Sequence, residues 1–271
     1  MSERAERRPD AAPTPLDPVA IVGMGALFPR ADGLDAYWRN LRDGVDCIQE
    51  VPASHWTPEE HFDPDPKSPD RTYARRGGFL PAVRLDPRAL GVSPNALEAT
   101  DSAQLLGLEV ARRALADAGY GPDGRAFDRA RSSVVLGVTG TLQLVIPLGA
   151  RLGSPIWRRA LADAGVDTAT AERVVEGIAA GYVPWSEDSF PGLLGNVVAG
   201  RIANRLDLHG TNCVVDAACA SSLSAMHLAI LELQARRSDM VLTGGVDTFN
   251  DVFMFMCFSK TPALSPTGDA R

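Results

Sequence analysis

The stretch TNCVVDAACASSLSAMHLAILELQARRSDMVLTGGVD, residues 211–247, predicts a strand, a turn, a helix and a second strand in that order. Residues 211–218 and 240–247 are short apolar runs of the kind that form buried strands. The helix between them covers residues 221–239, and one of its faces carries Leu223, Met226, Ile230 and Leu233. Because neither run alternates polar and apolar residues, the pattern favours a mostly parallel sheet covered on both faces.

The same alternation of strand and helix extends toward the N-terminus. Residues 132–141 and 18–29 are β-rich apolar runs with glycines near their ends, which predicts two further buried strands. Residues 195–210 have apolar residues at near-helical spacing, and residues 100–121 predict a longer helix with Thr100 as its N-cap. One apolar face of that helix carries Leu105, Leu108, Ala111 and Leu115. The predicted fold class is therefore α/β.

The remaining segments predict less regular structure. Residues 34–48 predict an amphipathic helix that Gly44 ends, and the proline-rich, charged residues 61–80 predict an exposed and largely irregular loop. Residues 145–190 are expected to be helical in places and to form an inserted or dimer-facing region. Residues 1–16 are charged and proline-rich, which predicts a disordered leader before a domain that covers residues 17–271.

Composition argues against several classes of protein. The chain has 27 Lys and Arg against 34 Asp and Glu, a net charge of −7, which disfavours a nucleic-acid-binding face. No run of about 18 apolar residues is present, so no membrane-spanning helix is expected. The sequence has no CxxC pair and no histidines at zinc spacing. We therefore expect a cytoplasmic protein without a metal, in which the four cysteines are reduced thiols.

Two further patterns suggest ligand sites but have simpler structural explanations. Gly23 and Gly25 could begin a dinucleotide-binding fingerprint, but Phe28 stands where the third glycine belongs. A strand that leaves the core through a glycine turn explains these residues better. Residues 63–70 carry three aspartates, but the spacing of a calcium-binding EF-hand is absent, which favours a solvated loop.

Cys219 lies where the predicted strand 211–218 turns into the predicted helix 221–239. Small neighbours leave room for a tight turn and for an approaching substrate, as in the nucleophile elbow of α/β-hydrolases. The positive end of the helix dipole favours a thiolate, and backbone N–H groups at the turn could stabilise an oxyanion. These residues alone leave two interpretations open, a nucleophile held in the turn or a small buried thiol that fills space.

The segment VVDAACASSLSA, residues 214–225, closely resembles the active-site stretch of β-ketoacyl synthases, the condensing enzymes of fatty-acid and polyketide synthesis. The resemblance continues in residues 18–29, 98–119, 195–210, 244–247 and 258–268. Residues 50–66, 75–87, 94–106 and 256–266 resemble the leading ketosynthase domain of polyunsaturated-fatty-acid synthases, which are iterative type I polyketide-type enzymes. The resemblance implies the N-terminal portion of a thiolase-like, layered αβαβα fold.

The resemblance also implies a mechanism. Cys219 would take an acyl chain from the phosphopantetheine of an acyl carrier protein, and malonyl-carrier would then lose CO2 and attack the thioester. The Cys219 N–H would form half of an oxyanion hole, and Phe258 matches an aromatic position of the family's acyl pocket, with a core residue as the alternative. No bound cofactor is implied. The implied partners are acyl carrier protein domains, acyltransferase and other domains of a multidomain synthase, and a second copy in a homodimer.

The sequence departs from the family pattern at the base. Its HGTGT-like and NIGH-like histidine stretches are absent, and so is the glycine-rich loop that supplies a second oxyanion donor. None of the chain's own histidines fits either stretch, namely His55, His61, His209 and His227. We therefore expect an incomplete acyltransferase that is inactive alone. The alternative is a non-catalytic or split-subunit module that pairs with a chain carrying the C-terminal half.

Overall fold

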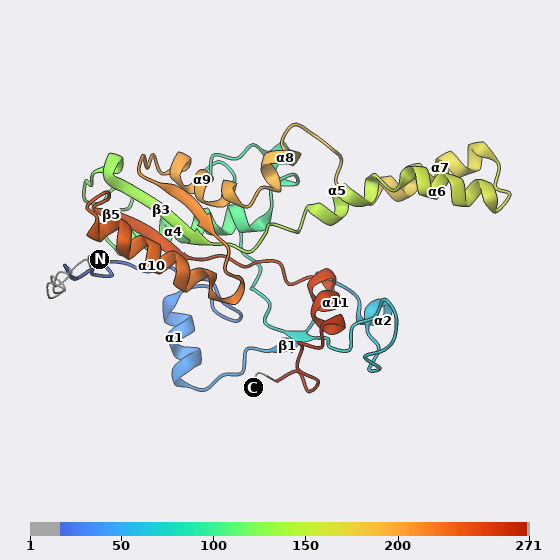
Figure 1. The fold of residues 1–271 in the computed structure, drawn as a ribbon, viewed down its shortest axis with the longest axis horizontal. Coiled ribbons are helices and arrows are strands. Elements are labelled where there is room, and N and C mark those ends of the chain that lie inside the picture. The colour runs from blue at the N-terminus through green and yellow to red at the C-terminus, as the bar shows by residue number, and fades with distance from the viewer. Residues whose placement is uncertain (1–16, 270–271) are drawn as a thin grey trace, which may run out of the picture.

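A computed structural model describes residues 17–269, and its centre is a parallel sheet of three strands (Figure 1). The strand order is β4 (Asn212–Val215), β3 (Ser132–Gly137) and β5 (Met240–Gly245). All six residues of β3 are buried, because this strand pairs with a neighbour on each side and is covered on both faces. The predicted strands at 132–141, 211–218 and 240–247 are thus confirmed, although each is shorter than predicted.

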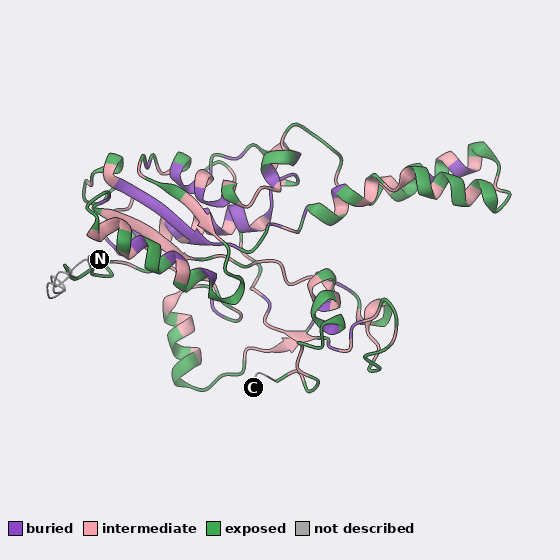
Figure 2. Cartoon of the chain, viewed as in Figure 1, coloured by how far each residue is buried: buried purple, intermediate pink, exposed green. Residues whose placement is uncertain are grey.

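Helices cover the two faces of this sheet. On one side α9 (Asn196–Arg205) packs on β3 and β4, and α4 (Ser102–Asp117) packs on α9. On the other side α10 (Ser221–Gln234) packs on β3 and β5. The predicted apolar face of the longer helix is confirmed, since Leu105, Leu108, Ala111 and Leu115 are all buried. Figure 2 shows β3 buried along its length, whereas α10 has much of its surface exposed.

The N-cap of α4 differs from the prediction. Asp101, not Thr100, caps the helix, and its carboxylate accepts a hydrogen bond from the Ala103 N–H at 2.9 Å. The Thr100 hydroxyl instead donates to the Ala96 carbonyl at the end of a short helix, α3 (Pro94–Leu97). Both residue types are good caps, and a threonine that already bonds to the preceding turn leaves the role to its neighbour.

The face of α10 that meets the sheet is also not the apolar one. Its buried residues are Ser221, Ala225 and Ala229, whereas Leu223 is 69% exposed and Met226 is exposed as well. Small side chains let the helix axis come close to the sheet, where β3 and β5 both end in glycine. The first half of the predicted stripe, Leu223 and Met226, is therefore turned away from the sheet, whereas Ile230 and Leu233 are half-buried.

The prediction of a buried strand at residues 18–29 is wrong. Within the described residues this segment contains no strand, and Ile21 is 76% exposed. The segment lies across α4 instead, where the Met24 N–H donates to the Asp117 carboxylate at 2.9 Å. A Cβ on Gly23 would lie 2.6 Å from the Ala114 carbonyl oxygen, so glycine permits this close approach. A parallel strand must pair with the edge of a neighbouring strand. Residues 18–29 pack on the surface of α4 instead.

A second, smaller apolar cluster joins residues 48–80 to a helix near the C-terminal end, α11 (Val252–Lys260). It contains Val51, Trp56, Ala74, Phe79 and Phe255. This region also holds α1 (Leu34–Arg42), α2 (Pro58–His61) and an antiparallel pair of β1 (Gln49–Glu50) and β2 (Arg76–Gly77). The exposed loop predicted for residues 61–80 is therefore partly wrong, because aromatic residues inside it supply a core.

A helical arm extends away from the sheet (Figure 1). It consists of α5 (Val145–Arg151), α6 (Ser154–Asp163) and α7 (Thr168–Ala180), and the short α8 (Ser189–Gly192) leads back to α9. An ion pair of 2.8 Å between Arg158 and Glu172 joins α6 to α7, and Trp157 stacks on Tyr182. The helices predicted within residues 145–190 are confirmed. Whether the arm faces a second copy stays a prediction.

No helix among residues 17–269 is both long and apolar enough to cross a membrane. The leader predicted for residues 1–16 lies outside the described part of the chain.

Replacing Leu108 by alanine is expected to lower the free energy of unfolding by about 3 kcal/mol, because the Leu108 side chain is fully buried between α4, α9 and β3 and its loss leaves a cavity. Urea denaturation followed by circular dichroism measures the change. The exposed Leu223 provides a matched control, and Leu223→Ala should change the same quantity by less than about 0.5 kcal/mol. Equal losses in the two variants would contradict the packing described for α4.

Candidate active site

The turn between β4 and α10 places Cys219 at the carboxyl edge of the sheet. After Val215 the chain passes through Asp216 and Ala217 into a single 3-10 turn, Ala218–Ala220, and α10 begins at Ser221. Ala218 has φ +48°, in the left-handed region. This conformation costs a residue with a Cβ roughly 1 kcal/mol, so surrounding contacts must hold it.

The Asp216 carboxylate supplies one set of these contacts. A single oxygen, Oδ1, accepts a hydrogen bond from the Ala218 N–H at 3.0 Å and another from the Thr139 hydroxyl at 2.9 Å. Thr139 follows β3, so the aspartate connects the turn after β4 to the end of the central strand. The turn is therefore fixed from the sheet side.

The Ser221 hydroxyl supplies a second set of contacts. It donates to the Ala218 carbonyl at 2.6 Å and accepts from the Ala217 N–H at 2.9 Å. Its oxygen also lies 3.2 Å from the Thr139 hydroxyl oxygen. Ser221 is buried, so these bonds are shielded from solvent and close the turn from the helix side.

Two glycines let the first turn of α10 sit directly on the sheet. A Cβ on Gly137, the last residue of β3, would lie 2.4 Å from the Ser221 carbonyl carbon and 2.5 Å from the Ser222 nitrogen. A Cβ on Gly245, the last residue of β5, would lie 2.9 Å from the Ser222 Cβ. Any side chain at Gly137 would displace the helix start, and with it the turn that carries Cys219.

Cys219 is exposed at this turn, so the interpretation of a buried, space-filling thiol is wrong. None of the backbone hydrogen bonds found within residues 17–269 uses the Cys219 N–H. That donor is available to an oxyanion formed on a group attached to the sulfur. An anion at this sulfur lies at the start of α10, where the helix dipole stabilises negative charge. The assignment of Cys219 as nucleophile stays a prediction.

Phe258 lies on α11 and is 44% exposed. Within residues 17–269, α11 buries Phe255 and Ser259 rather than Phe258, and the core interpretation of Phe258 stays open. Its place in an acyl pocket stays a prediction.

The four histidines lie elsewhere. His55 hydrogen-bonds to Ser54, His61 faces Trp56 and Glu60, and His209 pairs with Asp207 at 3.0 Å. His227 is exposed on α10, six residues after its first residue, which corresponds to about 9 Å along the helix axis. In the described part of the chain, no histidine forms a hydrogen bond with the Cys219 thiol.

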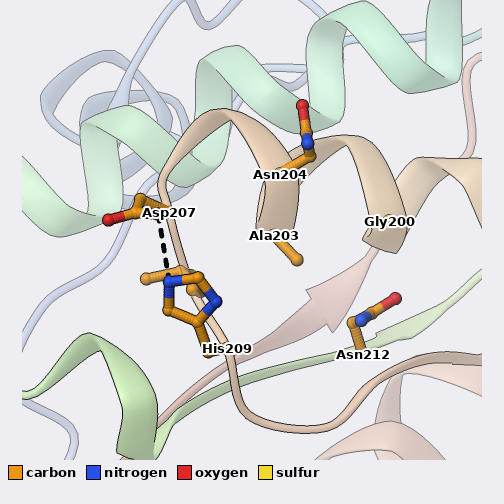
Figure 3. Close-up of a pocket in the computed structure, with 7 residues that line it drawn as sticks. Gly200, Ala203, Asn204, Asp207, His209 and Asn212 are labelled. Atoms are coloured by element: carbon orange, nitrogen blue, oxygen red, sulfur yellow. Dashed lines mark ion pairs between the residues drawn. The ribbon is translucent and has the colours of Figure 1, made fainter.

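A hollow beside these elements lies away from Cys219. A cavity of about 280 Å³ is lined by Gly200, Asn204, Asp207, His209 and Asn212, among others (Figure 3). It lies at the amino end of β4, whereas Cys219 follows the carboxyl end of that strand. The two sites are on opposite edges of the sheet, so this cavity does not serve the cysteine.

The roles of Asp216, Thr139 and Ser221 around the turn were missed in the sequence. A partial signal was present, since Asp216 is a polar residue near the end of the predicted strand 211–218 and precedes two alanines. An aspartate at that place commonly accepts a hydrogen bond from the N–H two residues later. The positive φ of Ala218 had no signal, because glycine or asparagine is the usual residue there.

Cys213 serves as an internal reference for thiol reactivity. Burial raises the pKa of the Cys213 thiol above its ordinary value, and the nearby Glu232 carboxylate raises this pKa further. Since only the thiolate is alkylated, we expect Cys213 to need a higher pH than an ordinary thiol. Glu232→Gln removes the negative charge and should speed Cys213 alkylation severalfold at pH 8. Site-resolved iodoacetamide kinetics check this, with Glu172→Gln in the arm as the control that should have no effect.

Comparison with known proteins identifies the family. Residues 16–271 match the family model described as "Beta-ketoacyl synthase, N-terminal domain". The chain is 37% identical over 253 residues to a polyunsaturated fatty acid synthase of Thraustochytrium sp., covering 93% of this chain and 9% of that protein. It is 35% identical over 254 residues to a phenolphthiocerol/phthiocerol polyketide synthase of Mycobacterium tuberculosis, covering 93% of this chain and 12% of that protein.

Solved structures agree with this result. The oxazolomycin ketosynthase domain OzmH KS7 of Streptomyces albus JA3453 has a TM-score of 0.68 at 28% identity, over 91% of this chain and 38% of that one. The ketosynthase from module 6 of the bacillaene synthase of Bacillus subtilis 168 has a TM-score of 0.69 at 25% identity, over 92% of this chain and 35% of that one. The chain thus spans about a tenth of its curated relatives and over a third of these ketosynthases. Its fold is the N-terminal portion of the thiolase-like fold, and the chain belongs to the β-ketoacyl synthase family as an N-terminal domain.

Proposed function

We propose that the chain carries the cysteine half of a condensing active site, in 3-oxoacyl-[acyl-carrier-protein] synthase chemistry for polyunsaturated fatty acid or polyketide synthesis. The observation that supports this most is the exposed Cys219 at the start of α10, on a turn fixed by three side chains. The family and the relatives that are polyunsaturated-fatty-acid and polyketide synthases support the same class of reaction.

The proposed reaction has two steps. First, the Cys219 thiolate attacks the carbonyl carbon of an acyl thioester on the phosphopantetheine of an acyl carrier protein. The new carbon–sulfur bond forms as the carrier thiolate leaves. Second, malonyl-carrier loses CO2, and the resulting carbanion attacks the Cys219 thioester. A carbon–carbon bond forms, the cysteine thiolate leaves, and the product is a 3-ketoacyl chain two carbons longer. The Cys219 N–H stabilises the oxyanion in both steps.

The group that assists the decarboxylation is not assigned to any histidine of this chain. His55 hydrogen-bonds to Ser54, and His209 pairs with Asp207. His61 lies beside Glu60, and His227 is about 9 Å along α10 from the helix start. We propose that a polypeptide with the family's two histidine motifs completes the site and supplies the second oxyanion donor. The 271-residue chain alone is then inactive in condensation.

The proposed setting follows from the relatives. They are large multidomain synthases, so the proposed partners are acyl carrier protein domains, an acyltransferase and other synthase domains. We propose residues 17–271 as the domain unit, a homodimer in the complete ketosynthase, a cytoplasmic location, and Phe258 as part of the acyl pocket. No cofactor beyond the carrier's phosphopantetheine is proposed.

A second candidate is an interaction module that pairs with a chain carrying the C-terminal half without condensing. The exposed apolar face of α10 favours it, since Leu223, Met226 and Leu231 are exposed there. Large apolar side chains gathered on one exposed helix favour an association site. The cysteine separates the two candidates, because an interaction module has no need of a reactive thiol at the turn.

A complementation assay tests the proposal. The purified chain is incubated with malonyl- and acyl-carrier thioesters, alone and with a polypeptide that carries the C-terminal part of a related ketosynthase. We expect no 3-ketoacyl product from the chain alone and product from the mixture. The mixture with Cys219→Ala should give none. Product from the chain alone would refute the account of the base. Pairing without any product would favour the interaction module.

A further inference from the structure

We propose that Asp216 is a positioning residue for Cys219. Its carboxylate oxygen acts by accepting hydrogen bonds, and its negative charge is not required. Its oxygen holds Ala218 in the left-handed conformation, and that conformation sets the place of Cys219 at the start of α10. The inference rests on the proposed function only for the role of Cys219 as nucleophile.

The geometry assigns this task to one atom. Asp216 Oδ1 accepts both from the Ala218 N–H at 3.0 Å and from the Thr139 hydroxyl at 2.9 Å, whereas no hydrogen bond within residues 17–269 uses Oδ2. An amide oxygen can accept the same two bonds. The negative charge is therefore not needed for the arrangement, and an asparagine would preserve it.

The two hydrogen bonds at Asp216 Oδ1 are called the clamp below. The clamp is needed because residue 218 is alanine. Ala218 has φ +48°, a conformation that glycine adopts freely and alanine does not. Without its N–H bond to Asp216, Ala218 would favour the right-handed region by about tenfold. Cys219 follows directly, so a change at Ala218 rotates the sulfur away from the positive end of α10.

Ser221 alone cannot replace the clamp. Its hydroxyl bonds to the Ala217 N–H and the Ala218 carbonyl, but not to the Ala218 N–H. Asp216 is the residue that accepts a hydrogen bond from the Ala218 N–H. The Thr139 hydroxyl, which follows β3, holds the Asp216 carboxylate in place. Loss of Asp216 therefore frees Ala218 while β4 and α10 stay in place.

A charge-based role makes the opposite prediction for asparagine. Asp216 is exposed and lies three residues before Cys219 in the sequence. If its charge mattered as a base, Asp216→Asn would abolish the effect. In the clamp, Asp216→Asn leaves Cys219 as reactive as before.

The test measures iodoacetamide alkylation of Cys219 relative to Cys257 in the full chain, by peptide mass mapping. Cys257 is exposed on α11 and serves as the internal reference. We expect Asp216→Ala to lower the ratio about five- to tenfold. Asp216→Asn should stay within about twofold of the unmodified chain. The double variant Asp216→Ala/Ala218→Gly should recover to within about twofold, because glycine adopts the left-handed conformation unaided.

A matched control removes a carboxylate that accepts a backbone hydrogen bond at a different 3-10 turn. Asp128 caps another 3-10 turn, Arg129–Arg131, by accepting from the Ala130 N–H at 2.9 Å at the amino end of β3. Asp128→Ala should leave the Cys219 to Cys257 ratio unchanged. Thermal unfolding of each variant shows whether the fold persists, and an unfolded variant would bring both thiols to equal rates.

The outcomes separate this inference from the proposed function. An unchanged ratio in Asp216→Ala, a loss in Asp216→Asn, or no recovery on adding Ala218→Gly would each overturn the clamp. Acyl-thioester transfer to Cys219 is measured on the same proteins. Transfer together with an unchanged ratio in Asp216→Ala would leave the nucleophile intact and refute the clamp. The predicted ratios without any acyl transfer would support the clamp and count against the proposed function.

Discussion

Replacing Cys219 by alanine is expected to reduce acylation of the chain by a small acyl thioester by at least about 100-fold. Cys219 is the exposed thiol at the start of a helix, with its own N–H free to stabilise the tetrahedral oxyanion. Cys213 is only partly exposed and has a raised pKa, so it does not take over the reaction. Intact-mass spectrometry of the chain after incubation with an acyl-N-acetylcysteamine measures the adduct.

The matched control for this result is Cys257→Ala. Cys257 is also exposed, but it lies inside α11 rather than at a helix start. The two variants remove the same side chain, so they differ only in the position of the thiol. We expect full acylation of Cys257→Ala. An adduct of normal yield on Cys219→Ala would show that another thiol reacts and would contradict the assignment.

Replacing Gly137 by alanine is expected to cost about 3 kcal/mol in the free energy of unfolding and to loosen the turn at Cys219. The added Cβ would lie 2.4 Å from the Ser221 carbonyl carbon, and a backbone atom cannot rotate away. Either β3 or the first turn of α10 must shift. Urea denaturation measures the free energy of unfolding, and iodoacetamide labelling measures the alkylation rate of Cys219. Both quantities should fall in Gly137→Ala.

Gly177 provides the control for the glycine substitution. It lies inside α7, and a Cβ there would meet nothing within 4 Å. Gly177→Ala should stabilise the chain by up to about 1 kcal/mol, because alanine is the better helix former. A destabilisation of Gly137→Ala no larger than the change in Gly177→Ala would contradict the seating of α10 on the end of β3.

The sequence predicts the sheet and its covering helices well because their signals are local. The strands β3, β4 and β5 are continuous apolar runs, and α4 has a regular buried face. Residues 18–29 carry the same strand signal, yet they lie across α4. An apolar run records a preference for pairing, but whether a strand edge is available depends on the rest of the molecule.

The face of α10 shows the same limit. Periodicity places Leu223 and Met226 on one side of the helix, and the structure turns that side outward because the sheet ends in glycines that favour small residues. A stripe of large apolar residues predicts that this face of the helix is buried, but it does not identify the surface that covers it. The sequence alone could not distinguish the sheet from another surface.

The candidate site was predictable in position but not in its supports. The strand-to-helix junction placed Cys219, and the resemblance to condensing enzymes gave it a reaction. The hydrogen bond from the Ala218 N–H to Asp216 Oδ1 is local, whereas the bond from Thr139 depends on the approach of the loop that follows β3. Such tertiary contacts have no periodic signature, and alanine carries no sign of a positive φ.

The most direct test of Cys219 as the nucleophile is the order in which limiting iodoacetamide labels the four cysteines of the unmodified chain at neutral pH, read by peptide mass mapping. We predict that Cys219 reacts first, ahead of Cys257, which is also exposed, and that Cys47 and Cys213 follow, since both are only partly exposed. Equal rates at Cys219 and Cys257, or a faster reaction at any other cysteine, would contradict the claim that the turn between β4 and α10 prepares a nucleophile.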